Sequence, residues 1–110
     1  MKIHLIKEKT IRQFVSGNSA GRASFIDWLS KVKMADWNTP EDIKNTFPSA
    51  DFLGNNTQRV IFDIGGNKYR MIGKYSFGVA KIWLYICWVG THSEYDKLCK
   101  QKKQFTVFDF

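Results

Sequence analysis

The residue types best suited to chemistry lie in two segments of the second half of the chain. One segment, Gly90-Thr91-His92-Ser93-Glu94-Tyr95-Asp96, places a histidine and a tyrosine three positions apart. The other begins at Asn67 and continues with three cations, Lys68, Arg70 and Lys74, at even spacings. Because successive side chains of a strand alternate between its faces, these cations would share one face, while Tyr69, Met71 and Tyr75 would share the other.

This combination suits cleavage of RNA without a metal ion. The 2′-hydroxyl can attack the neighbouring phosphate if one group takes its proton, another steadies the added negative charge and a third protonates the leaving oxygen. His92 and Tyr95 can transfer protons, and Arg70 can hold a phosphate through two parallel hydrogen bonds. Lys68 and Lys74 would then bind neighbouring phosphates. A helix beginning near His92 would add backbone N–H groups, which also favour a phosphate.

The same residues also have plainer explanations, and the sequence leaves them open. His92 can serve only at the start of a helix, Tyr95 can pack in a core, and the cations can form a solvated strand face. Nothing in the sequence brings Asp63 and Asp96 together as an acid–base pair, so we expect both to be surface charges.

Several common kinds of site are missing from the sequence. It has no glycine-rich phosphate loop and no HExxH, and its two histidines are His4 and His92. Cys87 and Cys99 have neither CxxC nor Cys/His ligand spacing, so we expect two free thiols in a reducing cytosol. We predict neither a metal site nor a cofactor.

The elements that would position these residues can be read from hydrophobic periodicity. A short strand near Ile3–Ile6 precedes two amphipathic helices, the second marked by apolar residues at positions 25, 28, 29 and 32. Thr39 and Pro40 start a short third helix. Strands are predicted over 60–64, 68–76 and 81–89, with a turn at Gly65-Gly66-Asn67, and Thr91 caps a last helix in a capping box with Glu94.

This order, β-α-α-(short α)-β-β-β-α, predicts a single α+β domain over residues 1–110, with one antiparallel sheet covered by helices on one face. We expect the cationic face of the 68–76 strand to be the exposed one. The tail from Cys99 to Phe110 could form an edge strand or a frayed end.

Charge and hydropathy narrow the class of partner. The formal net charge is +7, from 17 basic and 10 acidic residues, and the excess lies in the second half of the chain. Such a surplus favours polyanions, above all nucleic acids. The longest apolar run, Ile82–Val89, is far shorter than the ~20 residues that cross a bilayer. We therefore expect a cytoplasmic protein without a membrane partner.

Four blocks of the sequence, in the same order and spacing, resemble the HigB-type toxins of type II toxin–antitoxin systems. They are Trp37–Lys44, Phe47–Asp51, Arg59–Arg70 and Val89–Lys97. The resemblance implies a RelE-like fold and a toxin that cleaves mRNA on the ribosome, inhibiting translation and growth. It also implies a HigA-like, helix-turn-helix antitoxin that forms a hetero-oligomer with the toxin.

Within these blocks, Arg70, His92 and Tyr95 fall on positions that the resemblance makes catalytic. Asn67 and Lys68 fall on positions for RNA binding, to which we add Lys74. An alternative is a non-catalytic module on the same fold that binds RNA, the ribosome or a regulatory protein. The tail after Leu98 lies outside the resemblance, and its role is open.

Overall fold

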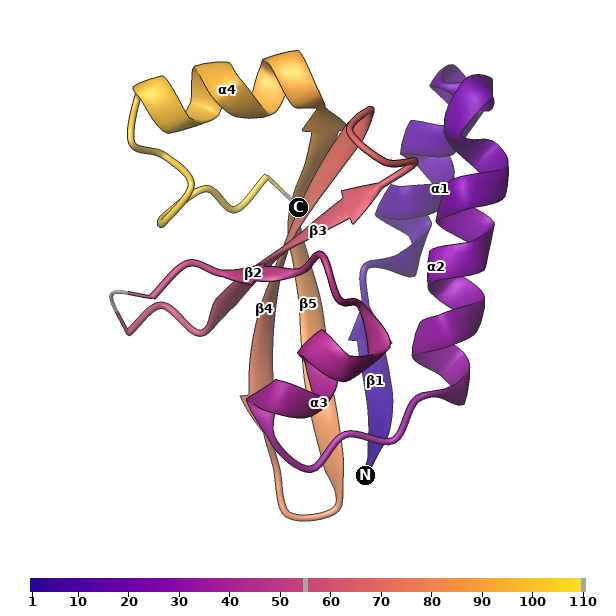
Figure 1. The fold of residues 1–110 in the computed structure, drawn as a ribbon, viewed down its shortest axis with the longest axis vertical. Helices are drawn as coiled ribbons and strands as arrows, with labels where there is room; N and C mark the ends of the chain where they lie inside the picture. Colours follow the sequence, from indigo (N-terminus) through magenta and orange to yellow (C-terminus); the bar gives the residue numbers. More distant parts are fainter. Residues whose placement is uncertain (55, 110) are drawn as a thin grey trace.

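A five-stranded sheet forms the centre of the computed structural model, which describes residues 1–54 and 56–109 (Figure 1). The strands lie in the order β1-β5-β4-β3-β2. Neighbouring strands are antiparallel except that β1 runs parallel to β5. Their bounds are β1 Lys2–Ile6, β2 Asp51–Phe52, β3 Arg59–Ile64, β4 Tyr69–Phe77 and β5 Lys81–Thr91.

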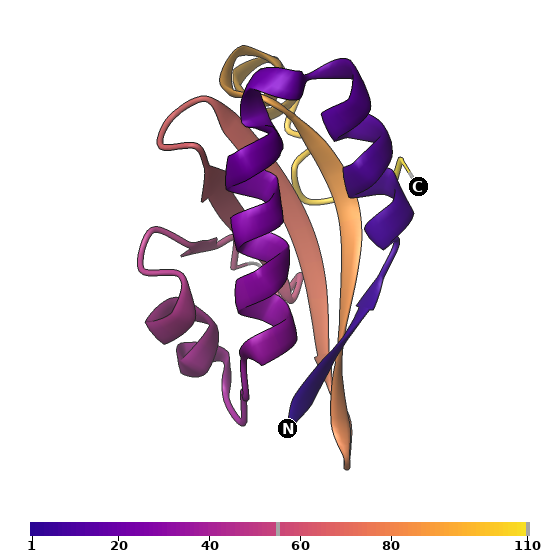
Figure 2. The ribbon, with the colours of Figure 1, turned by 90° about the vertical axis from the view of Figure 1, so that its right-hand side faces the viewer.

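Two long helices, α1 (Glu8–Gly17) and α2 (Arg22–Met34), cover one face of this sheet (Figure 2). The short 3-10 helix η1 (Ser19–Gly21) joins them. The predicted apolar stripe of α2 is confirmed, because Phe25, Trp28, Leu29 and Val32 are all buried. They pack with Phe62, Met71, Leu84 and other residues of the central strands into the main hydrophobic core.

The short helix α3 (Pro40–Thr46) begins where the sequence predicts. Pro40 is its first residue, and Asp42 Oδ2 accepts hydrogen bonds from the backbone N–H groups of Asn38 and Thr39 at 2.7 and 3.1 Å. Its buried Ile43 belongs to the main core. None of the helices in the described part of the chain is long and apolar enough to cross a membrane.

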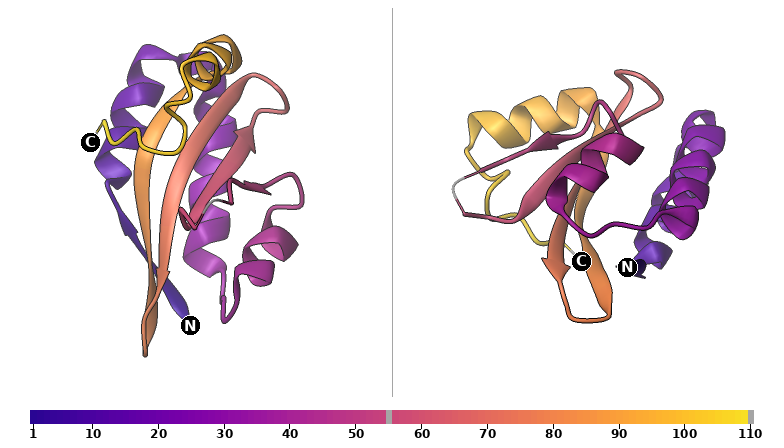
Figure 3. Two further views of the ribbon diagram at one scale, coloured as in Figure 1. Left: turned by 90° about the vertical axis from the view of Figure 1, so that its left-hand side faces the viewer. Right: turned by 60° about the horizontal axis from the view of Figure 1, so that its bottom comes forward.

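The last helix, α4 (His92–Lys100), and the tail after it lie on the opposite face of the sheet (Figure 3). They cover a second, smaller core of four buried residues, Ile61, Ile72, Cys87 and Trp88. Tyr95 and Leu98 of α4 and Val107 of the tail pack against this core. The two faces of the sheet are therefore both occupied.

The predicted α+β class is confirmed, and three details of the prediction are wrong. The predicted order has four strands, whereas the sheet has a fifth, the short β2 between α3 and β3. The sheet is mixed, because the helices after β1 provide the long connection that a parallel pairing requires. Helices also cover both faces, since α4 packs on the face that carries Arg70 and Lys74. The expected exposure of that face holds for Lys74, but the side chain of Arg70 is only 11% exposed.

The tail is neither an edge strand nor a frayed end. Arg59 Nη1 donates to the Gln104 carbonyl at 3.1 Å, and the backbone N–H of Asp109 donates to the Cys87 carbonyl at 3.0 Å. The ring of Phe108 lies 4.7 Å from that of Tyr85 between their centroids. The tail is thus attached to β3 and β5. The expected free thiols are confirmed for Cys87 and Cys99.

A tight contact at Gly21 joins the helical hairpin to β4 and predicts a stability difference. A Cβ atom there would lie 2.6 Å from Cε2 of Tyr69 and 3.2 Å from Phe25, both of them buried rings. We expect Gly21→Ala to lower the free energy of unfolding by about 1–3 kcal/mol through overpacking, measured by urea denaturation. Gly17→Ala is the matched control, because nothing lies within 4 Å of its Cβ position. Equal stability of the two variants would contradict the contact.

Candidate functional site

The candidate site is built around Arg70, which lies opposite a residue of each neighbouring strand. In register, Asp63 of β3 faces Arg70 on one side and Gly90 of β5 faces it on the other. Residues directly opposite in antiparallel strands share a face. The Arg70 side chain therefore projects toward the face covered by α4, between a carboxylate and a position without a side chain.

Local hydrogen bonds hold the guanidinium of Arg70 in place. Its Nε lies 3.0 Å from Asp63 Oδ1, Nη1 donates to the Tyr69 carbonyl at 3.1 Å, and Nη2 donates to Asn67 Oδ1 at 3.3 Å. A guanidinium has five N–H donors, so these contacts leave one on each terminal nitrogen. Those two donors can still form the paired hydrogen bonds that a phosphate accepts.

Gly90 leaves room beside Arg70 for an aromatic pair. A Cβ atom at position 90 would lie 2.5 Å from Cη2 of Trp88, so the indole ring occupies the space that a side chain would take. The ring of Tyr95 lies 6.0 Å from that of Trp88 between their centroids. These rings form the floor on which α4 rests.

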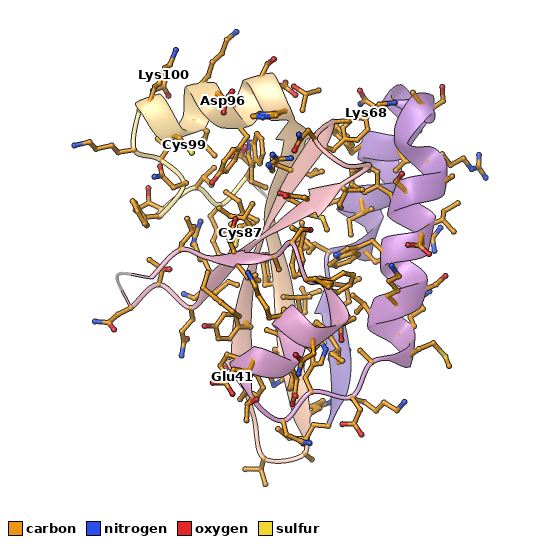
Figure 4. All side chains as sticks on the ribbon, viewed as in Figure 1. Glu41, Lys68, Cys87, Asp96, Cys99 and Lys100 are labelled. Carbon is orange, nitrogen blue, oxygen red and sulfur yellow. The ribbon has the colours of Figure 1, made fainter. Side chains whose placement is uncertain are left out.

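The start of α4 lies beside the β3–β4 turn, in which Gly65 and Gly66 adopt positive φ. The backbone N–H of His92 donates to the Lys68 carbonyl at 3.0 Å. In Figure 4, Lys68 and Asp96 consequently lie at the same end of the molecule. This bond brings the two segments that the sequence singles out into direct contact.

The predicted capping box is confirmed at the same place. Thr91 N–H donates to Glu94 Oε1 at 2.8 Å, and Glu94 N–H donates to Thr91 Oγ1 at 3.2 Å. With the His92 N–H also bonded, the helix start has fewer backbone donors for a phosphate than expected. The Glu94 carboxylate beside it opposes an anion as well. Phosphate binding by the helix N-terminus is therefore not supported, which leaves the task to side chains.

His92 faces a carboxylate of its own helix. Its Nδ1 is shielded from solvent and lies 3.3 Å from Asp96 Oδ2, one helical turn further on. The distance is that of an ion pair, although its angles are not those of a hydrogen bond. The His92 side chain as a whole is 42% exposed. Asp96 can thus orient the imidazole while leaving part of the ring open to a substrate.

Tyr95 lies on the inner side of α4, half-buried against the second core. Burial raises the pKa of its hydroxyl, the neighbouring Cys99 adds to this effect, and the charge of Arg70 opposes it. A tyrosine hydroxyl is protonated at neutral pH even at its ordinary pKa of 10.0, and the raised pKa extends this range to more alkaline pH. Tyr95 is therefore suited to donating a hydrogen bond and poorly suited to acting as a base.

The remaining candidate RNA-binding residues, Asn67, Lys68 and Lys74, lie at different distances from Arg70. Asn67 contacts it directly, whereas the exposed side chain of Lys68 extends from the turn. Lys74 is exposed and pairs in register with Arg59 and Tyr85. It lies four positions from Arg70 along β4, a span of about 13 Å. Lys74 could therefore contact RNA only away from the atoms around Arg70.

Two acidic residues that we expected to be surface charges contact the site. Asp63 binds Arg70 and is largely covered, so the expectation is wrong for Asp63, whereas Asp96 faces His92 but is exposed at the surface as expected. Asp96 had a signal in the sequence, because a spacing of four places it on the same helix face as His92. Asp63 had none: the predicted three-residue turn at 65–67 would put it opposite Tyr69, and only the observed four-residue connection, 65–68, puts it opposite Arg70.

A groove of about 470 Å³ lies between α2, the end of α3 and the β3–β4 turn. The charged residues that line it are Asp27, Lys31 and Asp63. Two acids against one lysine do not favour a polyanion. We therefore do not place the phosphate chain in this groove.

Comparison with known proteins gives consistent similarities. Residues 22–98 match the family model described as HigB toxin, the RelE-like toxic component of a toxin–antitoxin system. The mRNA interferase toxin HigB of Escherichia coli K12 is 28% identical over 94 residues, which cover 86% of this chain and 88% of that protein. The mRNA interferase HigB of Escherichia coli O6:H1 is 29% identical over 73 residues, or 66% of this chain and 69% of that protein.

The raised pKa of Tyr95 predicts a difference in alkaline stability. A hydroxyl whose pKa is higher in the folded state than its ordinary value of 10.0 stabilises the fold below that pH. The contribution is lost as the pH rises above 10.0 toward the folded-state pKa. We therefore expect the free energy of unfolding of the wild type to fall more steeply above pH 10.0 than that of Tyr95→Phe, measured by urea denaturation at stepped pH. Parallel pH curves for the two proteins would contradict the assigned burial.

Proposed function

This chain belongs to the HigB family, the RelE-like toxic components of toxin–antitoxin systems, and from that premise we propose that it is an mRNA endoribonuclease. Its cleavage of messages would inhibit translation and arrest growth. The relatives named above are mRNA interferases, which supports the same activity for this chain. The observation that carries the proposal is the contact between the segment 67–74, which bears the cations, and the segment 90–96, which bears His92. The His92 N–H donates to the Lys68 carbonyl, and Asp63 orients Arg70 beside this contact.

The proposed reaction uses the 2′-hydroxyl of RNA as the nucleophile. His92 takes its proton, and the oxygen forms a new bond to the adjacent phosphorus. The two unused N–H groups of Arg70 stabilise the added negative charge on the phosphoryl oxygens. The bond from phosphorus to the 5′-oxygen then breaks, that oxygen gains a proton from water, and a 2′,3′-cyclic phosphate remains.

Other residues of the site bind or position the substrate in this proposal. The protonated Tyr95 hydroxyl donates a hydrogen bond near Arg70, which suits a phosphoryl oxygen better than proton abstraction. Asn67 orients Arg70, Lys68 binds a phosphate beside the turn, and Lys74 binds one further along the face. No step in this scheme requires a metal ion.

The proposed partners are translated mRNA on the ribosome and an antitoxin. A HigA-like antitoxin with a helix-turn-helix would form a hetero-oligomer with the toxin and inhibit it. The net charge of +7 suits association with ribosomal and messenger RNA. Because the substrate is mRNA under translation, the place of action is the cytoplasm.

Induced expression with mapping of mRNA 5′ ends tests the activity. We expect the wild type to arrest growth and create new 5′ ends, and Arg70→Ala to reduce cleavage by about 10²-fold or more through lost charge stabilisation. His92→Ala should also reduce it, by about 10²–10⁴-fold if proton transfer depends on this group. Arg22→Ala, an exposed arginine at the start of α2, is the matched control.

Because Arg70→Ala leaves the Asp63 carboxylate without its partner, the double variant Asp63→Asn/Arg70→Ala should accompany it. Circular dichroism would verify that each variant is folded. Growth arrest by the wild type without new message ends would refute the nuclease and favour a non-catalytic RNA-binding module. Full cleavage by folded His92→Ala would refute only the role of His92.

The position of Asp96 predicts a positioning effect on His92. The negative charge of Asp96 beside Nδ1 favours the tautomer that carries its proton on that nitrogen, so Asp96→Asn should shift the tautomer and reduce cleavage by about 10- to 100-fold. Nitrogen NMR of the histidine side chain would report the tautomer directly. Asp27→Asn is the control, since Asp27 pairs with Lys31 at the same spacing on α2. An unchanged tautomer and rate would show that Asp96 is only a surface charge.

A further inference from the structure

Four lysines gather where α4 ends and the tail begins. We call Lys97, Lys100, Lys102 and Lys103 the terminal lysine patch; all four are exposed. Among the described residues, none of them forms an ion pair with an acid. Three of the four follow residue 98, where the match to the family model ends. The patch is therefore largely a feature of this chain outside the matched region.

The patch is ordered, because hydrogen bonds close the end of the helix. Lys102 N–H donates to the Cys99 carbonyl at 2.9 Å, and Lys103 N–H donates to the Leu98 carbonyl at 3.1 Å. The Lys103 carbonyl accepts from Val107 N–H at 2.8 Å. With the tail attached through Arg59 and Gln104, the lysines have a fixed backbone arrangement.

One of these lysines occupies a position that favours glycine. Lys102 has φ +57, the left-handed conformation with which many helices end. A side chain there is strained, and glycine would adopt the same backbone more readily. Lys7, outside the patch, has the same type of backbone, so the value of Lys102 is as a test: glycine there removes a charge without straining the chain.

Helix stabilisation accounts for only part of the patch. Lys97 and Lys100 lie in the last turn of α4, where cations favourably meet the negative end of the helix dipole. Lys102 and Lys103 lie beyond the helix and add like charge beside the first two. Such repulsion is unfavourable unless an anion binds across the group.

We propose that the terminal lysine patch binds phosphates of the RNA strand on one side of the cleavage position. The helix of nine residues is about 13 Å long, and His92 is at its first residue. In Figure 4, Lys100 marks the end of α4 and Asp96 lies nearer its start. An RNA strand held at Arg70 and His92 can therefore follow α4 outward to the patch. The inference deepens the proposed function, because the ligand is the substrate of that site.

Binding of a 2′-O-methyl RNA oligonucleotide tests the patch without cleavage, because this probe lacks the attacking hydroxyl. The test variant replaces all four patch lysines with Gln, and the matched control replaces Lys2, Lys7, Lys9 and Lys81, which are also exposed and form no ion pair with an acid among the described residues. Both lose the same charge. We expect the patch variant to bind about tenfold or more weakly at ~0.1 M salt, by fluorescence anisotropy. Its slope of log affinity against log salt should decrease by about 2–3, since each phosphate contact contributes about 0.7.

The single variant Lys102→Gly separates binding from folding. We expect it to raise Tm, because glycine relieves the positive φ, and at the same time to weaken RNA binding. Unchanged affinity and salt slope in the four-lysine variant would overturn the proposal and point to an acidic protein as the partner of the patch. Equal losses in the patch variant and the control would also overturn it. Patch-dependent binding by a wild type that makes no new mRNA ends would instead refute the nuclease and leave the patch standing.

Discussion

The pairing of Asp63 with Arg70 is the interaction on which the rest of the site depends. Arg70 is held in the sheet with most of its side chain covered, and a buried cation without a partner would be costly. Asp63 offsets that cost from the strand directly opposite. The same contact fixes the direction of the guanidinium, so its two unused donors are oriented before any substrate arrives. A single pair thus stabilises the hairpin and prepares the site.

The second layer of the fold follows from how α4 is attached to this hairpin. Gly90 lets the Trp88 ring lie beside Arg70, and Tyr95 packs on that ring from α4. The bond from His92 N–H to the Lys68 carbonyl then sets the helix against the turn. The same packing of α4 against the sheet consequently forms the smaller core and brings the residues of the candidate site together. Tyr95 and Leu98 pack α4 against the smaller core, and this packing positions His92 at the first residue of the helix.

Periodicity predicted most elements, and the errors concern contacts between distant segments. The stripe on α2, the start of α3 and the capping box at Thr91 depend on neighbouring residues and were predicted correctly. The parallel pairing of β1 with β5 joins segments about 80 residues apart, which local patterns do not encode. The His92–Asp96 contact could have been predicted from helix spacing. The Arg70–Asp63 contact could not, because the predicted three-residue turn gives another register than the observed four-residue connection. The tail could not, because its anchor at Arg59 lies 45 residues away.

The cations of the second face divide according to their chemistry. Arg59 and Arg70 are largely buried, and carbonyl or carboxylate oxygens hold their planar groups in one orientation. Lys68, Lys74 and the terminal lysine patch are exposed, with flexible point charges. Oriented arginine suits short-range recognition of a phosphate, whereas free lysines create the field that attracts a polyanion from a distance. Replacing Arg70 with lysine would therefore remove the fixed orientation of its donors, whereas replacing the exposed lysines with arginine would leave the positive charge of the surface unchanged. In the proposed function, the exposed lysines would attract the RNA strand and Arg70 would position one of its phosphates.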